Sequence, residues 1–220
     1  MKVIQCWDDG LASDVYLADM LRRHRAKATF CLNPGLYQRE RSFGWIHENM
    51  EVWRLGIHEL RNVYDGFEIC SHSMTHPYLT GLSPDQLNRE VRASRDMLED
   101  IFQKSVLGFC YPFNVYDESA MNAVRSAGYI WARGNQHRDG TFPPADPFEF
   151  HPSCHVLDRE FWVKYDHAKI TNGVFFFWGH SCELINASMW ENLERTLDRI
   201  SLDPEAEWSF VNDLFYLLLS

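Results

Sequence analysis

The chain has no block of lysine and arginine, and its acidic side chains outnumber its basic ones. Its 220 residues carry 31 Asp and Glu against 21 Lys and Arg, a formal net charge of −10. This excess of negative charge repels polyanions, so nucleic acid is not expected as a partner. The sequence also has no internal repeat, low-complexity tract or linker, and residues 1–220 are expected to form one domain.

Long apolar runs are missing as well. No segment approaches the roughly 20 apolar residues of a membrane-spanning helix, and the apolar tail at 214–219 is expected to be a packed terminal helix. Lys2 leads directly into the first predicted strand, and no separate hydrophobic stretch of a secretory signal precedes it. These absences predict a cytoplasmic protein without a membrane span.

The C-x-x-C spacing that is typical of zinc sites built from thiolates does not occur among the six cysteines. Four of them lie in apolar, strand-like runs, where a free thiol behaves as a small buried hydrophobe. A disulfide framework is typical of much shorter secreted chains. The cysteines are therefore interpreted as core residues rather than as cross-links, metal ligands or nucleophiles.

Two short polar motifs carry the strongest chemical signal. Asp8 and Asp9 are adjacent and precede Gly10, and two imidazoles follow at His72 and His76. One carboxylate and two imidazoles are a common ligand set for a hydrolytic metal with an open coordination position. The second carboxylate is then free to act as a general base. Gly10 permits a sharp backbone turn, which could bring both acids to one site.

Each motif also has an ordinary structural interpretation. Asp-Asp-Gly is frequent in turns, and the four-residue spacing of the histidines matches a single helical turn that Pro77 would end. Position favours the metal site, because residues 2–7 and 66–70 read as buried strands that end just before these motifs. In barrel-like α/β folds, active sites lie at the carboxyl ends of strands.

Strand and helix signals alternate along the rest of the chain. Residues 83–86, Ser-Pro-Asp-Gln, combine an N-cap serine, a proline at the first helical position and a glutamine at the capping-box position. The predicted helices cover residues 14–25, 43–61, 84–103, 118–127, 158–167 and 188–200, and further strands cover 26–32, 106–111, 129–132 and 173–178. Residues 134–152 read as a long loop. This alternation predicts a largely parallel sheet, either open or closed into a barrel.

Three motifs together resemble those of the NodB-homology polysaccharide deacetylases, carbohydrate esterase family 4. They are Trp7-Asp8-Asp9-Gly10, Glu68-Ile69-Cys70-Ser71-His72-Ser73-Met74-Thr75-His76-Pro77 and Trp178-Gly179-His180-Ser181, in the order that the family has. The resemblance implies an α/β fold, a distorted (β/α) barrel of the NodB-homology type with mostly parallel strands. It also implies a metal-dependent hydrolase that removes an acyl group, in particular N-acetyl, from an amino sugar or glycan.

The same resemblance implies roles for individual residues. Asp9, His72 and His76 match the ligands of one divalent metal ion, for which zinc is expected. Asp8 matches the catalytic base. His180 matches the general acid that protonates the leaving group, a task for which the ordinary pKa of histidine is suited. The alternative for His180 is a buried core histidine.

A fourth family motif, Arg-x-Pro-Tyr, is altered in this chain. Cys110 stands where the family has its arginine, and Phe113 stands where it has its tyrosine. The backbone N–H of Phe113 survives the exchange and is still expected to contribute to an oxyanion hole beside the substrate. Arg133, at the end of the next strand, is predicted to supply the missing guanidinium to Asp8; an exposed surface charge is the alternative. A similar arrangement occurs in domains associated with gellan lyases.

Several alternatives stay open. Either Glu183 or Asp166 is expected to orient His180, because the usual Asp-and-Trp motif of the family is not recognisable. Trp7 and Trp178 flank motif residues and are interpreted either as an apolar platform for a sugar ring or as core aromatics. The site also admits an N-formyl group, a non-sugar amide or ester, or a carbohydrate-binding pseudoenzyme. Non-haem iron oxygenases use similar ligands, but their usual β-sandwich does not match the alternating helices.

Overall fold

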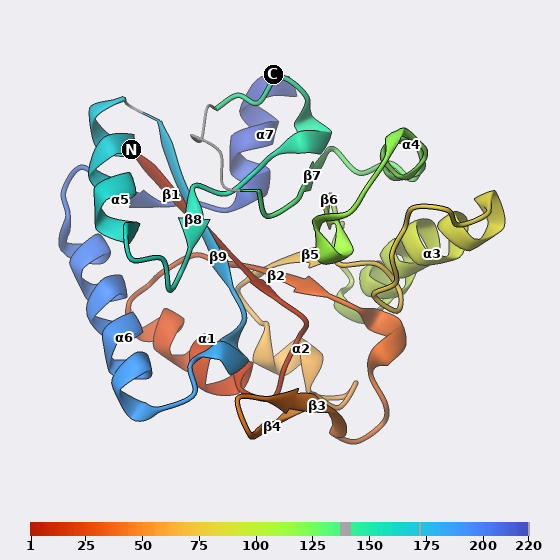
Figure 1. Ribbon diagram of the computed structural model, residues 1–220, viewed down its shortest axis with the longest axis horizontal. Helices are drawn as coiled ribbons and strands as arrows, with labels where there is room; N and C mark the ends of the chain where they lie inside the picture. The colour runs from red at the N-terminus through yellow and green to blue at the C-terminus, as the bar shows by residue number, and fades with distance from the viewer. Residues whose placement is uncertain (137–141, 172, 220) are drawn as a thin grey trace.

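A curled, parallel sheet forms the centre of the protein, and helices pack around it (Figure 1). The computed structural model describes residues 1–136, 142–171 and 173–219, without the side chains of 217–219. The strands of the sheet are β1 (Lys2–Asp8), β2 (Thr29–Leu32), β5 (Glu68–Ser71), β6 (Gly108–Cys110), β7 (Trp131–Arg133), β8 (Cys154–His155), β9 (Val174–Gly179) and β10 (Glu207–Trp208). Their order is β7-β6-β5-β2-β1-β9-β8, and β10 pairs with the start of β1. Parallel pairing brings the carboxyl ends of β1, β5 and β9, where the three motifs lie, to the same edge.

One short segment, residues 150–155, connects the two ends of the sheet. At its start, Phe150 donates its backbone N–H to Ala132 O of β7 at 3.0 Å. Three residues later, Ser153 donates to Phe176 O of β9 at 2.7 Å. The sheet therefore curls round on itself, and the prediction of a distorted (β/α) barrel with mostly parallel strands is confirmed.

Helices cover the outside of the curled sheet, with α5 and α6 beside β8 and β9 and with α3 and α4 beyond β5 and β6 (Figure 1). Their bounds are α1 (Asp14–Arg23), α2 (Leu60–Val63), α3 (Pro84–Phe102), α4 (Glu118–Ser126), α5 (Phe161–Ile170), α6 (Ala187–Leu202) and α7 (Val211–Leu219). The capping box predicted at the start of α3 is present, because Ser83 and Gln86 exchange hydrogen bonds. Among the described residues, none of these helices combines the length and the apolar character needed to cross a membrane.

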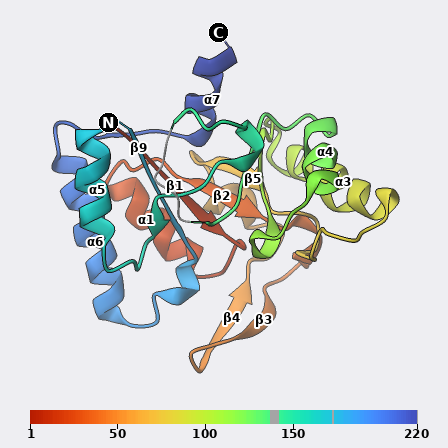
Figure 2. The ribbon, with the colours of Figure 1, turned by 45° about the horizontal axis from the view of Figure 1, so that its top comes forward.

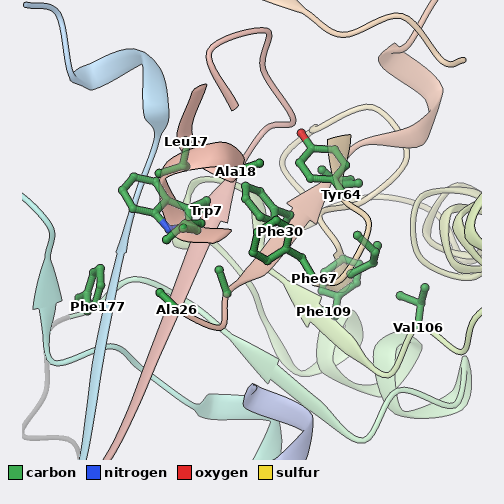
Figure 3. Close-up of a cluster of buried hydrophobic side chains, with 14 of the residues drawn as sticks. Trp7, Leu17, Ala18, Ala26, Phe30, Tyr64, Phe67, Val106, Phe109 and Phe177 are labelled. Atoms are coloured by element: carbon green, nitrogen blue, oxygen red, sulfur yellow. The ribbon is translucent and has the colours of Figure 1, made fainter. Parts of the chain in front are cut away.

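The outward-facing side chains of the strands form the larger hydrophobic core (Figure 3). Trp7 on β1 is completely buried and lies beside Leu17 and Ala18 of α1, and its Nε1 donates to Gln5 Oε1 at 2.8 Å. Side chains alternate between the faces of a strand, so Trp7 points outward where Asp8 points inward. The interpretation of Trp7 as part of a sugar platform is therefore wrong; it is a core aromatic.

The inward-facing side chains form a second core, which lies beneath the carboxyl edge of the sheet. Cys6, Cys31, Cys70 and Cys110 come from four strands and are each at most 2% exposed, and they are free thiols. Their interpretation as core residues is confirmed. At the other end of this core α7 packs in, where the ring of Phe215 stacks on Trp131 at 6.0 Å.

A β-hairpin stands where a helix was predicted over residues 43–61. Strands β3 (Ser42–His47) and β4 (Met50–Arg54) pair antiparallel and project from the body (Figure 2). The turn residues Glu48 and Asn49 have positive φ angles of 46° and 64°, which a two-residue hairpin turn requires. The helix-like spacing of aromatic and branched residues here was misleading, because cross-strand contacts between residues such as Trp45 and Val52 decide the conformation.

Candidate active site

A cavity of about 430 Å³ opens at the carboxyl edge of the sheet, and the chemistry-bearing residues of the motifs line it. Its wall includes the predicted ligands Asp9, His72 and His76, together with Asp8 and His180. A cavity of this size is typical of sites for small ligands. Asp9 and His72 are 63 positions apart in the chain, and His76 and His180 are 104 apart, so the fold brings together groups that the sequence separates.

The turn after β1 has the sharp geometry that was expected of Asp-Asp-Gly. Asp9 has a φ of 78° and Gly10 a φ of 66°, both in the left-handed region. A Cβ atom on residue 10 would lie 1.7 Å from the hydroxyl of Tyr37, so only glycine fits. The Tyr37 hydroxyl in turn donates to Asp9 O at 3.3 Å. This turn separates the two carboxylates, so that Asp8 pairs with Arg133 whereas Asp9 lies beside His72 and His76.

The three predicted metal ligands lie together. Asp9 Oδ1 is 3.9 Å from His72 Nε2 and 4.0 Å from His76 Nε2, and the two Nε2 atoms are 3.1 Å apart. A tetrahedral ion with bonds near 2.1 Å holds its ligand atoms about 3.4 Å apart. The donor set and its spacing therefore fit a divalent ion such as zinc.

The geometry of the histidine pair comes from an irregular loop. Ser73 and His76 have positive φ angles of 65° and 60°, and His76 N donates to Ser73 Oγ at 2.9 Å. The helical turn predicted for this motif is therefore wrong. His72 Nδ1 lies 2.9 Å from Cys110 O, so a proton on Nδ1 leaves the Nε2 lone pair aimed at the cluster.

Asp8 is buried and forms an ion pair with Arg133. Strands β6 and β7 are in register with Cys110 beside Arg133, so the guanidinium reaches the same edge of the sheet and donates to Asp8 Oδ1. The predicted contact is therefore present, although the catalytic role of Arg133 stays a prediction. Burial raises the pKa of Asp8 to about 6, and the guanidinium opposes that rise. Asp8 is thus ionised at neutral pH.

Replacing Arg133 by lysine is expected to lower kcat/KM by about 10- to 100-fold, the equivalent of one charged hydrogen bond. A point charge cannot reproduce the planar fork of the guanidinium. Replacing it by glutamine should also raise the pKa of Asp8, so the acidic limb of the pH–rate profile moves to higher pH. Steady-state kinetics across pH test both expectations, with Arg125→Lys outside the cavity as control. An unchanged limb would assign Arg133 a structural role only.

His180 lines the same cavity as Asp8, and its Nε2 lies 3.8 Å from Asp9 Oδ2. Its Nδ1 is 3.3 Å from Glu183 Oε2, and its backbone N–H donates to the same oxygen at 2.9 Å. Asp166, the alternative partner, is exposed on α5. Burial lowers the pKa of His180, but the hydrogen bond to Glu183 and the nearby aspartates outweigh it and raise the pKa to about 9.

Replacing Glu183 by glutamine is expected to move the basic limb of the pH–rate profile to lower pH. The carboxylate stabilises the protonated imidazole, so its removal lowers the pKa of His180, and a general acid is lost once pH exceeds its pKa. The measurement is kcat against pH, with the exposed carboxylate variant Glu207→Gln as control. A limb that stays in place would show that Glu183 does not govern the acid.

The predicted substrate-binding aromatics differ in position. Phe113, with a φ of 55°, is half exposed on the rim, and its ring lies 4.4 Å from that of His76. Trp178 is part of the wall and lies 5.7 Å below the guanidinium of Arg133. Trp7, as described above, faces the outer core. Phe113 and Trp178 therefore keep their predicted place at the cavity.

Several residues at the site were not predicted from the sequence. His155 Nε2 lies 2.8 Å from Glu183 Oε2, because the two-residue strand β8 pairs with β9 beside Trp178. Trp45 and Arg54 reach the cavity from the hairpin. A two-residue strand has no recognisable periodicity, and a segment interpreted as a helix could not suggest a cavity wall.

Comparison with known proteins gives matches over much of the chain. Residues 1–131 match the family model described as polysaccharide deacetylase. The chain is 26% identical over 128 residues to YxkH of Bacillus subtilis (strain 168), a protein named for the same family; the match covers 58% of this chain and 42% of that protein. The chain thus spans less than half the length of this curated relative.

Solved structures with a similar fold cover nearly the whole chain. A family 4 carbohydrate esterase from Bacillus anthracis has a TM-score of 0.62 and 16% identity, over 98% of this chain and 82% of that one. Another protein of the same organism, the family 4 pseudoenzyme BA3943, also has a TM-score of 0.62 and 16% identity, over 97% and 65% of the two chains. At 16% sequence identity, these two matches show that the folds are similar and no more.

Proposed function

Because the chain belongs to the polysaccharide deacetylase family, we propose that it is a metal-dependent hydrolase that removes an acyl group, N-acetyl first of all, from an amino sugar or glycan. The observation that carries the proposal is the arrangement of three units in one cavity. These are the cluster of Asp9, His72 and His76, the buried Asp8 and the imidazole of His180. A base, an acid and a cation site around one space are what hydrolysis of an amide or ester needs.

The residues have complementary tasks. Asp9, His72 and His76 would hold a divalent ion, for which we propose zinc; when bound, it supplies Lewis-acid chemistry that acidifies water and polarises a carbonyl oxygen. Asp8 accepts the proton of the attacking water at a carboxylate oxygen. His180, oriented at Nδ1 by Glu183, donates a proton from Nε2 to the leaving nitrogen or oxygen.

Other residues of the chain act on these groups. Arg133 keeps Asp8 ionised and aimed into the cavity. The backbone N–H of Phe113, on the rim beside His76, is proposed to stabilise the negative charge that develops on the acyl oxygen. Trp178 offers an apolar wall for the sugar.

The test combines metal analysis with a substrate panel. Purified protein is expected to contain one divalent ion per chain and to release acetate from N-acetylated oligosaccharides, and chelation followed by zinc addition should remove and restore that activity. Parallel assays of N-formyl sugars and of non-sugar amides and esters distinguish the alternative substrates. Metal-loaded, folded protein that releases no acyl group from any of them, yet binds the oligosaccharides, would instead identify a carbohydrate-binding pseudoenzyme.

A further inference from the structure

The β3–β4 hairpin carries a guanidinium for which the described residues provide no hydrogen-bond acceptor. Arg54 at the end of β4 lines the active-site cavity, and its Nη1 is buried without a hydrogen-bond acceptor. Among the residues that the structure describes, no carboxylate forms an ion pair with Arg54. Buried polar groups are almost always hydrogen-bonded, so a guanidinium at a cavity wall that has no acceptor among the described residues indicates a ligand that supplies one.

The position of Arg54 is fixed from two sides. Its strand is tied to the turn that follows the catalytic carboxylates, since Ala12 N donates to Trp53 O at 2.8 Å and Leu11 pairs with Arg54. On the hairpin itself, the guanidinium lies 5.0 Å from the ring centre of Trp45, which also lines the cavity. The guanidinium is therefore held at a set place relative to Asp8 and Asp9.

The hairpin also makes room for this guanidinium. The pairing of β3 with β4 shifts register between Phe43 and Trp45, and Gly44 occupies the bulge. A Cβ atom on residue 44 would lie 2.9 Å from Arg54 Nη1 and 3.1 Å from Val52 O. Any larger residue would thus displace the guanidinium, which connects the bulge to the orientation of Arg54.

The charges of the cavity decide what Arg54 attracts. Asp8 and Arg133 neutralise each other, and among the described residues that line the wall the other carboxylate and guanidinium are those of Asp9 and Arg54. A divalent ion at the cluster of Asp9, His72 and His76 then makes the cavity positive, although the chain as a whole carries a charge of −10. Such a cavity favours a ligand that carries negative charge.

We propose that Arg54 binds a carboxylate on the sugar unit next to the acylated one, so that the substrate is an acidic glycan. This inference rests on the proposed deacylase function. A guanidinium fork matches the two oxygens of a carboxylate. One fork with one positive charge suits a carboxylate monoanion better than a phosphate monoester, which carries more charge and three strong acceptors. Trp45 restrains the fork, so Arg54 and Trp45 determine specificity and take no part in bond cleavage.

The experiment compares two N-acetylated oligosaccharides that differ only in one carboxylate, a uronic-acid-containing oligomer and its carboxyl-reduced form. The zinc-loaded wild-type protein is expected to show a KM about 10- to 100-fold lower for the acidic ligand, with similar kcat, and the preference should shrink as salt is raised. Arg54→Gln should abolish the preference, because the KM for the acidic ligand rises until it equals the KM that the same variant shows for the reduced ligand. The matched control is Arg41→Gln. Arg41 is exposed, lies just before the hairpin in the chain and forms an ion pair with Glu59.

Calorimetric titration of the Asp8→Asn variant with the same two ligands separates this inference from the proposed function. A carboxylate preference in binding that Arg54→Gln removes supports the inference even if no acetate is released from either ligand. Equal affinity for both ligands, binding of neither, or a preference that survives Arg54→Gln overturns it, even where acetate release proceeds. A stronger response to a phosphorylated oligosaccharide of the same length than to the uronic acid also overturns it.

Discussion

Replacing Asp8 by asparagine is expected to lower kcat by about 10²- to 10⁴-fold, the usual contribution of a general base, while metal stoichiometry is unchanged. The carboxylate that pairs with Arg133 lies outside the proposed metal-binding cluster of Asp9, His72 and His76, so we expect the ion to bind without it. Asparagine keeps the size of the side chain and an oxygen for the guanidinium, but it cannot accept the proton of water.

Metal content and kcat of Asp8→Asn, measured on the same folded preparation, test whether Asp8 acts as the base without binding the ion. The variant leaves Arg133 buried without its counter-charge, so a loss of stability of roughly 3–5 kcal/mol is also expected. Asp14→Asn is a suitable control, since Asp14 is equally buried but binds Ser181 and Tyr64 outside the cavity. Loss of the ion in Asp8→Asn would make Asp8 a ligand; full turnover would remove it from the mechanism.

Replacing His72 by alanine is expected to remove the ion and the activity together. His72 is 3% exposed, and its Nε2 lies 3.1 Å from that of His76, at the centre of the cluster. Loss of an outer partner of a ligand typically weakens metal binding 10- to 100-fold, so removal of a ligand itself should weaken it by more than about 100-fold. Elemental analysis after dialysis measures the stoichiometry directly.

Thermal unfolding gives an independent readout for His72→Ala. A ligand that binds only the folded state raises its stability, so zinc should raise the Tm of the wild type and leave that of the variant unchanged. His58→Ala controls for the loss of an imidazole, since His58 is exposed and contacts Arg39 O away from the cavity. A His72→Ala protein that retains one tightly bound ion would place the metal elsewhere.

The sequence predicted those parts of the structure that depend on local patterns. The motif residues follow buried strands, and parallel strands meet at one edge, so the gathering of Asp9, His72 and His180 could be expected. The family assignment from the same motifs is confirmed by the family model over residues 1–131. The relation to domains associated with gellan lyases and the single-domain organisation stay predictions.

The parts that the sequence did not predict depend on pairing between distant segments. The hairpin of β3 and β4 was interpreted as a helix because its aromatic residues recur at helical spacing, whereas its turn at Glu48 and Asn49 has no Asn-Gly signature. The contact of His155 with Glu183 requires β8 to add to β9. Trp7, in contrast, could have been assigned to the core, because neighbours in a strand face opposite sides and Asp8 faces the cavity.

The side-by-side register of Cys110 and Arg133 has a consequence for how such proteins change over evolutionary time. Positions 110 and 133 lie side by side on adjacent strands, and both side chains face Asp8. An arginine on either strand can therefore provide the positive charge beside this carboxylate. A lineage that gains the second arginine before losing the first passes through no uncharged intermediate. If relatives were sorted into active and inactive members only by whether position 110 is an arginine, this chain would be counted as inactive, although Arg133 pairs with Asp8. The more informative criterion is whether any side chain in space provides the guanidinium.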